Sequence, residues 1–314
     1  MNVEYREYRS KDHSKYEKFC INHFGLSKYQ SNKNHLKWLA SNKASFFKIA
    51  VLSDKIIGCI HGYEAPILTN KGIVDFIVLH DLAIDKNYKG IGLKLMRQSI
   101  YNDKPVILAH VTKKMAITYK KIGSIELPSY WARKFIFPYS IFNKKKFLSS
   151  INKNIKTNKN IKILNNKNSK HLTNIKDLFN NLYSHKNYND FFNWRFINSN
   201  SPLTYFAYDN CMENLAIFSI GFKSFIPFAR IYSVINSNQE TYNYIIKEIE
   251  KFCQKKGISI IYFSVIGPDT EQKNIQYKKT KIQPYCGWFS KNTVEFNDVY
   301  INGFSTDLAF NGYW

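Results

Sequence analysis

One stretch of the sequence joins an apolar run to a helical pattern through a short turn that contains two glycines. Residues 73–84 (IVDFIVLHDLAI) are apolar enough for a central strand, and Gly90 and Gly92 follow in the turn DKNYKGIG. Apolar residues then recur at helical spacing. In a strand–turn–helix unit, backbone N–H groups and the positive end of the helix dipole point into the turn. The stretch therefore predicts a site for an anion such as phosphate.

The elements around this unit alternate between strand and helix patterns, which predicts an α/β fold with a mixed sheet. Ser10 is expected to cap the first helix, and Gly25 to end it. Further strands are expected at 3–9, 45–52, 55–64, 105–111, 204–208, 215–222, 226–234 and 258–266, and further helices at 34–40, 114–122, 174–192 and directly before Gly257.

A chain of 314 residues is long enough for about two domains. Residues 143–170 contain nine lysines and no acidic residue, with few large apolar side chains to bury. This composition predicts a linker. The expected organisation is a domain at 1–142, the Lys/Asn-rich linker at 143–170, and a second domain at 171–314.

The formal net charge of +23 raises the question of a polyanionic partner. Forty of the 46 basic residues are lysines, whereas base and phosphate recognition relies strongly on arginine. Abundant Lys, Asn and Ile also fit AT-rich coding drift. No nucleic-acid partner is therefore expected, although peripheral contact with an anionic membrane stays open.

The sequence has no apolar run of the length that a membrane span needs, and its first residues lack the apolar core of a signal peptide. Its five cysteines are scattered and form no CxxC pair. Neither a disulfide framework nor a metal site is expected from this spacing. A cytoplasmic location is therefore expected.

Residues 79–123 resemble the GCN5-related N-acetyltransferase (GNAT) superfamily. Two motifs carry the resemblance: Leu82-Ala83-Ile84 followed by NYKGIG at 87–92, and YKKIG at 119–123. Asn87 stands where the family usually has Gln or Arg. The second half lacks the glycine turn but repeats a strand–helix–strand unit. Together with the aromatic–Arg cluster FNWRF at 192–196, this half makes the chain similar to tandem-domain acetyltransferases of bacterial surface-glycan synthesis. The resemblance implies two GNAT-like domains, of which the C-terminal one is degenerate.

The resemblance also implies that acetyl-CoA is the co-substrate. Its pyrophosphate would bind the N–H groups of the glycine turn, and its pantetheine arm would pair with the edge of the preceding strand. The residues expected to bind it are Leu82, Ala83, Ile84, Asn87, Lys89, Gly90, Ile91, Gly92 and Leu93.

The family's thiolate-protonating tyrosine corresponds to Tyr119, which is expected at the start of its helix. His80 and Asp81 are competing candidates for the base that deprotonates the acceptor amine. Strand alternation places them on opposite faces of the sheet. In the second half, Trp194 and Arg195 either contact a sugar and its anionic group or pack in the core.

The expected function is N-acetyl transfer from acetyl-CoA directly to a primary amine of a small molecule or glycan. An amino sugar of a bacterial surface polysaccharide, or its nucleotide-linked precursor, is the favoured acceptor. Two alternatives remain: a Fem-type aminoacyl-tRNA-dependent transferase, and a basic protein that binds nucleic acid or membrane. The sequence fixes neither the acyl chain length nor the oligomeric state.

Overall fold

The computed structural model divides the chain into two compact units. Unit 1 comprises Met1–Pro128 and Gln283–Tyr300, and unit 2 comprises Ser129–Ile282 and Ile301–Trp314. The structure describes residues 2–25, 29–42, 45–69, 72–100, 104–108, 111–127, 129–136, 161–167, 172–182, 186–198, 203–211, 213–223, 226–235, 239–266, 278–281, 285–288 and 301–302.

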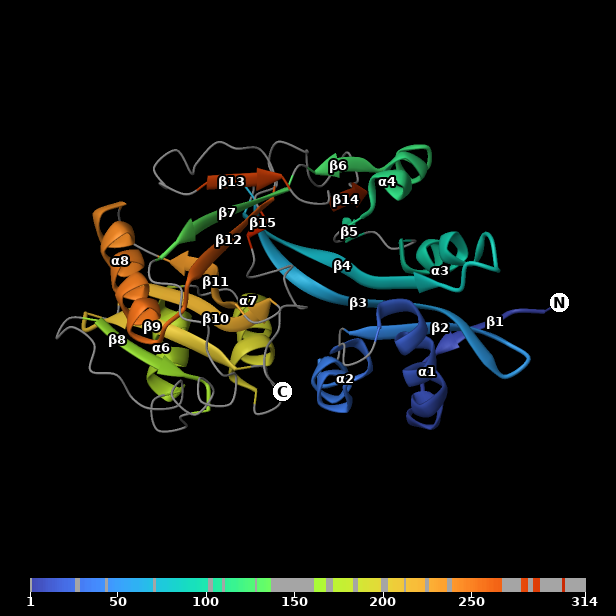
Figure 1. Ribbon diagram of the computed structural model, residues 1–314, viewed down its shortest axis with the longest axis horizontal. Coiled ribbons are helices and arrows are strands. Elements are labelled where there is room, and N and C mark those ends of the chain that lie inside the picture. Colours follow the sequence, from blue (N-terminus) through green and yellow to red (C-terminus); the bar gives the residue numbers. More distant parts are fainter. Residues whose placement is uncertain are drawn as a thin grey trace. The chain divides into compact units, whose positions relative to one another are not determined.

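The described strands of unit 1 form one mixed sheet in the order β1-β2-β3-β4-β5-β14-β6 (Figure 1). Its neighbouring strands are antiparallel except for β4 and β5, which are parallel. The strands are β1 (Glu4–Glu7), β2 (Phe46–Leu52), β3 (Lys55–Thr69), β4 (Gly72–Ile84), β5 (Val106–Leu108), β6 (Ile125–Leu127) and β14 (Tyr285–Trp288). A mixed α/β fold is thus confirmed for the first half.

Four helices cover the two faces of this sheet (Figure 1). They are α1 (His13–Phe24), α2 (Lys33–Ala40), α3 (Ile91–Ile100) and α4 (Lys113–Lys120). Tyr16 and Leu36 of α1 and α2 join one apolar core, whereas Leu95 and Ala116 of α3 and α4 join another. Because alternate residues of β2 and β3 contribute to both cores, the sheet is buried on both faces.

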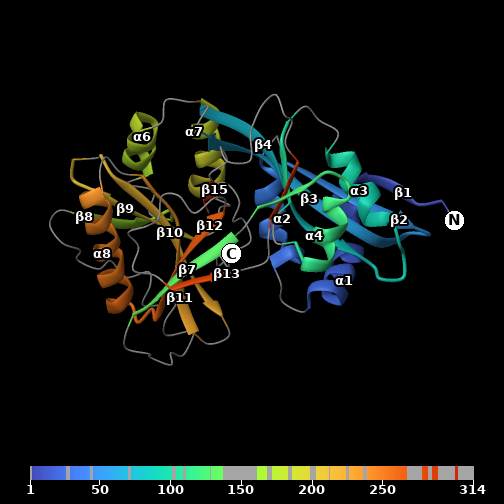
Figure 2. The same ribbon diagram turned by 90° about the horizontal axis from the view of Figure 1, so that it is seen from above.

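The described strands of unit 2 form a second mixed sheet in the order β13-β7-β12-β11-β10-β9-β8, with β15 paired to β12 (Figure 2). The strands are β7 (Ser129–Phe135), β8 (Ile161–Asn165), β9 (Thr204–Asp209), β10 (Leu215–Lys223), β11 (Ile226–Ile235), β12 (Ile260–Ile266), β13 (Lys278–Lys281) and β15 (Ile301–Asn302). Only β11 and β12 pair in parallel among these described strands.

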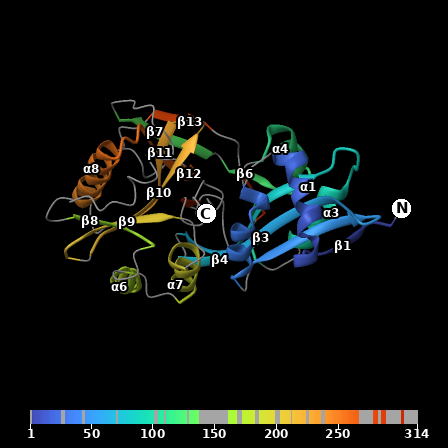
Figure 3. The same ribbon diagram turned by 60° about the horizontal axis from the view of Figure 1, so that its bottom comes forward.

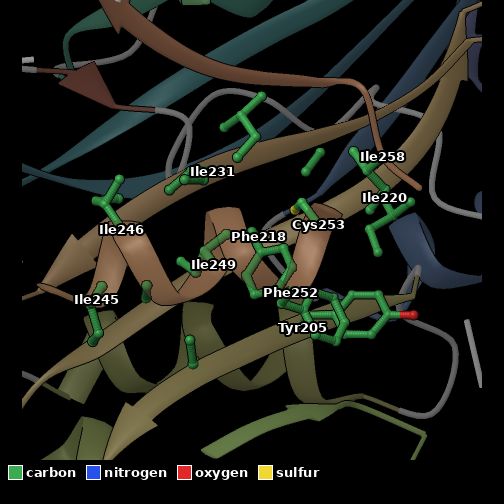
Figure 4. Packing of buried hydrophobic residues seen from close by; sticks show 14 of the residues in the cluster. Tyr205, Phe218, Ile220, Ile231, Ile245, Ile246, Ile249, Phe252, Cys253 and Ile258 are labelled. Atoms are coloured by element: carbon green, nitrogen blue, oxygen red, sulfur yellow. The ribbon is translucent and has the colours of Figure 1, made fainter. Parts of the chain in front are cut away.

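One long helix, α8 (Gln239–Lys255), packs against one face of this second sheet. Its apolar stripe, including Ile245, Ile249 and Phe252, meets Tyr205 and Phe218 of the strands (Figure 4). The other face is covered by α6 (Leu172–Leu182), α7 (Lys186–Phe192) and a π-helix at Asn193–Ile197 (Figure 3). α6 and α7 together correspond to the helical region expected at 174–192.

Each half of the sequence contributes one strand to the sheet that the other half mainly forms. β7 lies in the expected first domain but pairs with β12 of unit 2, and β14 lies in the expected second domain but pairs with β5 and β6 of unit 1. The expected continuous domains at 1–142 and 171–314 are therefore wrong in this respect. Strand pairing between distant segments leaves no signal in local periodicity.

The expected linker at 143–170 also contains an ordered element. Ile161–Asn165 forms β8, which pairs antiparallel with β9. Ile161 is fully buried, so the alternating residues IKI behave as a half-buried edge strand. Residues 143–160 and 168–170 lie outside the described part of the chain.

Local details at the helix starts and ends complete the fold. Ser10 begins a short 3-10 helix that precedes α1, so it does not cap α1 as expected, whereas Gly25 follows the helix with a φ of +91°.

Among the described residues, no helix combines the length and the apolar composition that a bilayer span requires.

Candidate functional site

The turn between β4 and α3 is anchored at its first residue, Asp85. The Asp85 N–H donates to the Ile57 carbonyl at 2.8 Å, and its carboxylate accepts from the Asn87 N–H at 3.1 Å and from Lys55 Nζ at 3.0 Å. The hydrogen bond from Lys55 holds the pKa of Asp85 below its ordinary value. This side chain fixes the position at which the chain leaves the sheet. Asn87 therefore contributes through its backbone, as part of an Asx turn.

The two glycines of the turn are needed for different reasons. Gly90 has a φ of +82°, a conformation that favours glycine. Gly92 has an ordinary φ, but a Cβ there would lie 3.0 Å from Ile84 Cγ1. The second glycine thus lets α3 start directly against the end of β4. Gly90 thus allows the tight turn, and Gly92 allows the close approach of α3 to Ile84.

The start of α3 presents backbone donors. Its first helical bond runs from the Lys94 N–H to the Gly90 carbonyl at 3.2 Å, so the N–H groups of Ile91 to Leu93 precede the helical ladder. Lys86 and Lys89 are exposed in the turn. Oriented N–H groups, the helix dipole and two ammonium groups together favour a phosphate-bearing ligand here.

Among the described residues, β5 pairs with three residues in the middle of β4. The register joins Ile77 to Val106 and ends at Leu79 opposite Leu108, among the described residues. β4 continues to Ile84, still paired with β3. Its last residues, which include the predicted Leu82, Ala83 and Ile84, therefore form an edge with backbone groups available for an extended ligand.

A β-bulge lies where β4 separates from β5. His80 pairs with His61 and Ala83 pairs with Cys59, so Asp81 and Leu82 lie opposite Ile60 alone. Asp81 has a φ of +52°, which is uncommon for a residue with a side chain. The bulge interrupts the two-residue alternation of the strand.

Because of this bulge, His80 and Asp81 contact each other. His80 Nδ1 lies 2.8 Å from Asp81 Oδ2, and Gln30 Nε2 donates to Asp81 Oδ1 at 3.1 Å. The expectation that the two side chains occupy opposite faces is wrong, since it assumed unbroken alternation. The carboxylate orients the imidazole through Nδ1. The other ring nitrogen, Nε2, is not engaged by Asp81.

Two further histidines lie beside this pair, and no sequence motif indicated either of them as a site residue. His61 of β3 places Nδ1 3.7 Å from Asp81 Oδ2, and His35 of α2 joins the same cluster. Burial lowers the pKa of His35 to about 3 and holds the pKa of His61 well below its usual value. Both are therefore neutral imidazoles at neutral pH. Their sequence spacing gave no signal because they lie on separate elements.

Tyr119 lies on the α3–α4 face of the sheet. It is in the last turn of α4, not at its start as expected, and its side chain is 2% exposed. Its ring packs edge-to-face on Trp288 of β14, with the ring centroids 5.7 Å apart. Burial raises the pKa of the Tyr119 phenol, so it keeps its proton at neutral pH.

Trp194 and Arg195 lie apart from these groups, in the π-helix of unit 2. Trp194 is 7% exposed and Arg195 is 2% exposed. The Arg195 guanidinium lies 5.1 Å from the Phe196 ring centroid and 5.4 Å from that of Tyr232. This location favours the packing role over contact with a sugar.

Unit 1 therefore brings together most of the predicted residues. The turn and the free edge of β4 are adjacent along the chain, the imidazole–carboxylate pair lies where that edge begins, and Tyr119 lies on the other face of the sheet.

The sequence matches no protein-family model and no curated protein.

Solved structures share the fold at low sequence identity. A GCN5-related N-acetyltransferase from Anabaena variabilis is 13% identical with a TM-score of 0.57, over 91% of this chain and 72% of that chain. One from Kribbella flavida is 8% identical with a TM-score of 0.56, over 91% and 70%.

A third similar structure is a GCN5-related glucosamine N-acetyltransferase region in a fungal multi-domain β-N-acetylglucosaminidase. It is 12% identical with a TM-score of 0.53, and the match covers 91% of this chain but only 38% of that longer chain. The glycine turn, the separated strands and these similarities agree: this chain has the fold of the GCN5-related N-acetyltransferases.

Proposed function

We propose that the protein is an acyl-CoA-dependent N-acyltransferase that transfers an acetyl group to a primary amine. The observation that carries the proposal is the separation of β4 from β5 directly before the glycine turn into α3. This arrangement offers one ligand both a strand edge and a phosphate site. Coenzyme A has the matching parts, an arm with two amides and a pyrophosphate.

In the proposed complex, the pyrophosphate accepts hydrogen bonds from the N–H groups of Gly90 to Leu93. Lys86 and Lys89 add screening charge. The pantetheine amides pair with the backbone of Leu82 to Ile84 as an additional strand would. The thioester then lies near the bulge at Asp81, where the imidazole–carboxylate pair is found.

The reaction forms a C–N bond and breaks the C–S bond of the thioester. The neutral acceptor amine attacks the carbonyl carbon, and the coenzyme leaves as a thiolate that takes up a proton. Tyr119 is the proposed donor of that proton, because a phenol carries its proton at neutral pH and Tyr119 lies on the α3–α4 face of the sheet. No covalent enzyme intermediate is required.

The attacking amine must also lose protons. His80 is the proposed acceptor, since Asp81 binds its Nδ1 and leaves Nε2 as the basic nitrogen. Asp81 acts by positioning the ring. Tyr119 and His80 belong to opposite faces of the sheet, so the proton is removed on one side of the thioester and delivered on the other.

The proposed acceptor is the amine of an amino sugar, free or linked to a nucleotide. The glucosamine acetylation named for the similar fungal region supports this class. The His80–Asp81 pair beside the free edge of β4 places an imidazole near the proposed position of the acceptor.

Acetyl-CoA binding tests the core of the proposal. A ligand present at 100 times its dissociation constant stabilises a protein by about 2.7 kcal/mol, so the melting temperature should rise. Gly90→Asp should abolish the rise, because it places a carboxylate where the pyrophosphate binds. Gly25→Asp is the matched control: Gly25 also has a positive φ and open space for a Cβ, but lies after α1.

Turnover is then followed as thiol release with a panel of free amines, amino sugars and nucleotide-linked amino sugars. Release with amino sugars alone supports the full proposal. Release with other amines only would reject the sugar acceptor. An unchanged melting temperature together with no release for any amine would reject acyltransfer itself.

A further inference from the structure

Three side chains from three different elements converge beneath the bulge of β4. They are His35 of α2, His61 of β3 and Asp81 of β4, and their nearest ligand atoms all lie within 4.8 Å of one another. Both histidines are fully buried, and the Asp81 side chain is 7% exposed. Two imidazoles and one carboxylate meeting in the interior form a donor set typical of transition-metal sites.

Neighbouring side chains hold these groups from outside. The Tyr16 hydroxyl lies 3.2 Å from His61 Nε2, while Gln30 Nε2 and His80 Nδ1 lie 3.1 and 2.8 Å from the two oxygens of Asp81. Metal-binding histidines and carboxylates are usually oriented in this way by hydrogen bonds to their other polar atoms.

With Nε2 engaged by Tyr16, His61 directs Nδ1 toward the centre of the cluster. This nitrogen is buried and makes no hydrogen bond within the described part of the chain. Its distance of 3.7 Å from Asp81 Oδ2 is too long for a hydrogen bond but close to the separation of two ligands around one ion. Ligands at about 2.0–2.2 Å in tetrahedral geometry lie roughly 3.3–3.6 Å apart.

We propose that His35, His61 and Asp81 bind one Zn²⁺ ion. The two imidazole nitrogens disfavour Mg²⁺ and Ca²⁺, which prefer oxygen ligands. Four-coordinate Zn²⁺ suits a compact site, with the fourth position taken by water or by a polar group of the acceptor. The ion neutralises the negative charge of the buried Asp81 carboxylate. It also connects α2 to β3 and β4, which orders the α1–α2 face beside the free edge of β4. This binding does not depend on the proposed acyltransfer.

Zinc binding is measured on the full chain after treatment with a chelator and its removal. Zn²⁺ is titrated in competition with a chromophoric chelator, and the melting temperature is followed in parallel. The expected result is one tightly bound equivalent and a higher melting temperature. Cys211→Ser serves as the background, because Cys211 is the exposed thiol among the described cysteines.

Two substitutions remove ligands. His35→Gln and Asp81→Asn should abolish tight binding, and asparagine tolerates the positive φ at position 81. His23→Gln is the matched control, since His23 is an exposed histidine of α1. Cys59→Ser should also leave binding unchanged, because the neighbouring Cys59 thiol contacts the Asp81 carbonyl and is not a proposed ligand.

Tyr16→Phe keeps the buried ring and removes only the hydroxyl that orients His61. It should weaken zinc binding by about 10- to 100-fold, and it remains informative if His35→Gln fails to fold. No tight equivalent in the parent chain, or equal affinity in the parent and Tyr16→Phe, would overturn the proposal. Acetyl-CoA binding is measured on the same samples, so failure of the zinc site is distinguished from failure of acyltransfer.

Discussion

Trp288 packs edge-to-face on Tyr119, with the two ring centroids 5.7 Å apart. The Trp288 indole N–H also donates to the Ile122 carbonyl at 3.3 Å. A residue from the last part of the chain thus supports the helix that carries the proposed proton donor. The contact arises because β14 lies between β5 and β6 in the sheet of unit 1.

The first prediction concerns the fragment 1–142. It lacks β14, so the paired edges of β5 and β6 are exposed and Tyr119 loses its aromatic partner. We expect this fragment to show no cooperative unfolding transition and no acetyl-CoA binding. Thermal unfolding followed by circular dichroism checks this.

Co-expression of 1–142 with 143–314 is the control for that experiment. The second fragment supplies β14, so the pair should recover a cooperative transition. A fragment 1–142 that unfolds cooperatively on its own would contradict the strand exchange.

The second prediction concerns Trp288 alone. Trp288→Ala removes a partly buried ring from the core of unit 1, and we expect a loss of roughly 2–3 kcal/mol in the free energy of unfolding, below the ~3–5 kcal/mol of a fully buried aromatic residue. Trp288→Phe should lose less, because the ring contact remains. Denaturant titration of both variants measures the difference. Equal losses would mean that the indole hydrogen bond dominates.

The central strand and its turn could be predicted from sequence because their signals are local. The apolar run of β4, the positive φ at Gly90 and the close approach at Gly92 each act within a few residues of one another. The places of β7 and β14 depend on pairing with distant strands, which composition and periodicity do not encode. The length of the chain therefore predicted two units, but it could not predict their boundaries.

The candidate site shows the same division. His80 and Asp81 could be proposed as site residues because they adjoin the strand end, but their orientation depends on a bulge that no sequence pattern indicates. His35 and His61 reach Asp81 only through the packing of α2 and β3 against β4. A cluster assembled across three elements has no characteristic spacing, so it could not be predicted.

The third prediction concerns Tyr119 as a proton donor. Tyr119→Phe removes the hydroxyl but keeps the ring on Trp288, so the melting temperature and the acetyl-CoA dissociation constant should change little. The turnover number should fall about 100-fold or more, the range for loss of a general acid. Thiol-release kinetics at saturating acetyl-CoA measure it. An unchanged turnover number would remove Tyr119 from the mechanism.

The fourth prediction concerns the ion pair between Arg6 and Asp12, which joins β1 to the start of α1. Arg6 Nη1 and Nη2 bind the two Asp12 oxygens at 2.7 and 2.9 Å, and the Asp12 side chain is 5% exposed. The hydrogen bond from Arg6 lowers the pKa of Asp12. Since the folded pKa is below the unfolded value of about 3.9, the contribution is complete above that value and is lost as pH falls through the folded pKa.

The free energy of unfolding, measured by denaturant titration from pH 7 down to about pH 2, should therefore fall less in Asp12→Asn than in the parent chain. At pH 7 this variant should be roughly 1–3 kcal/mol less stable than the parent, because the partly buried Arg6 guanidinium loses its charged acceptor. Asp54→Asn is the control: Asp54 pairs with Lys15 but is 82% exposed, so solvent screens the pair. If both variants keep the full acid sensitivity of the parent chain, the Arg6–Asp12 pair does not set it.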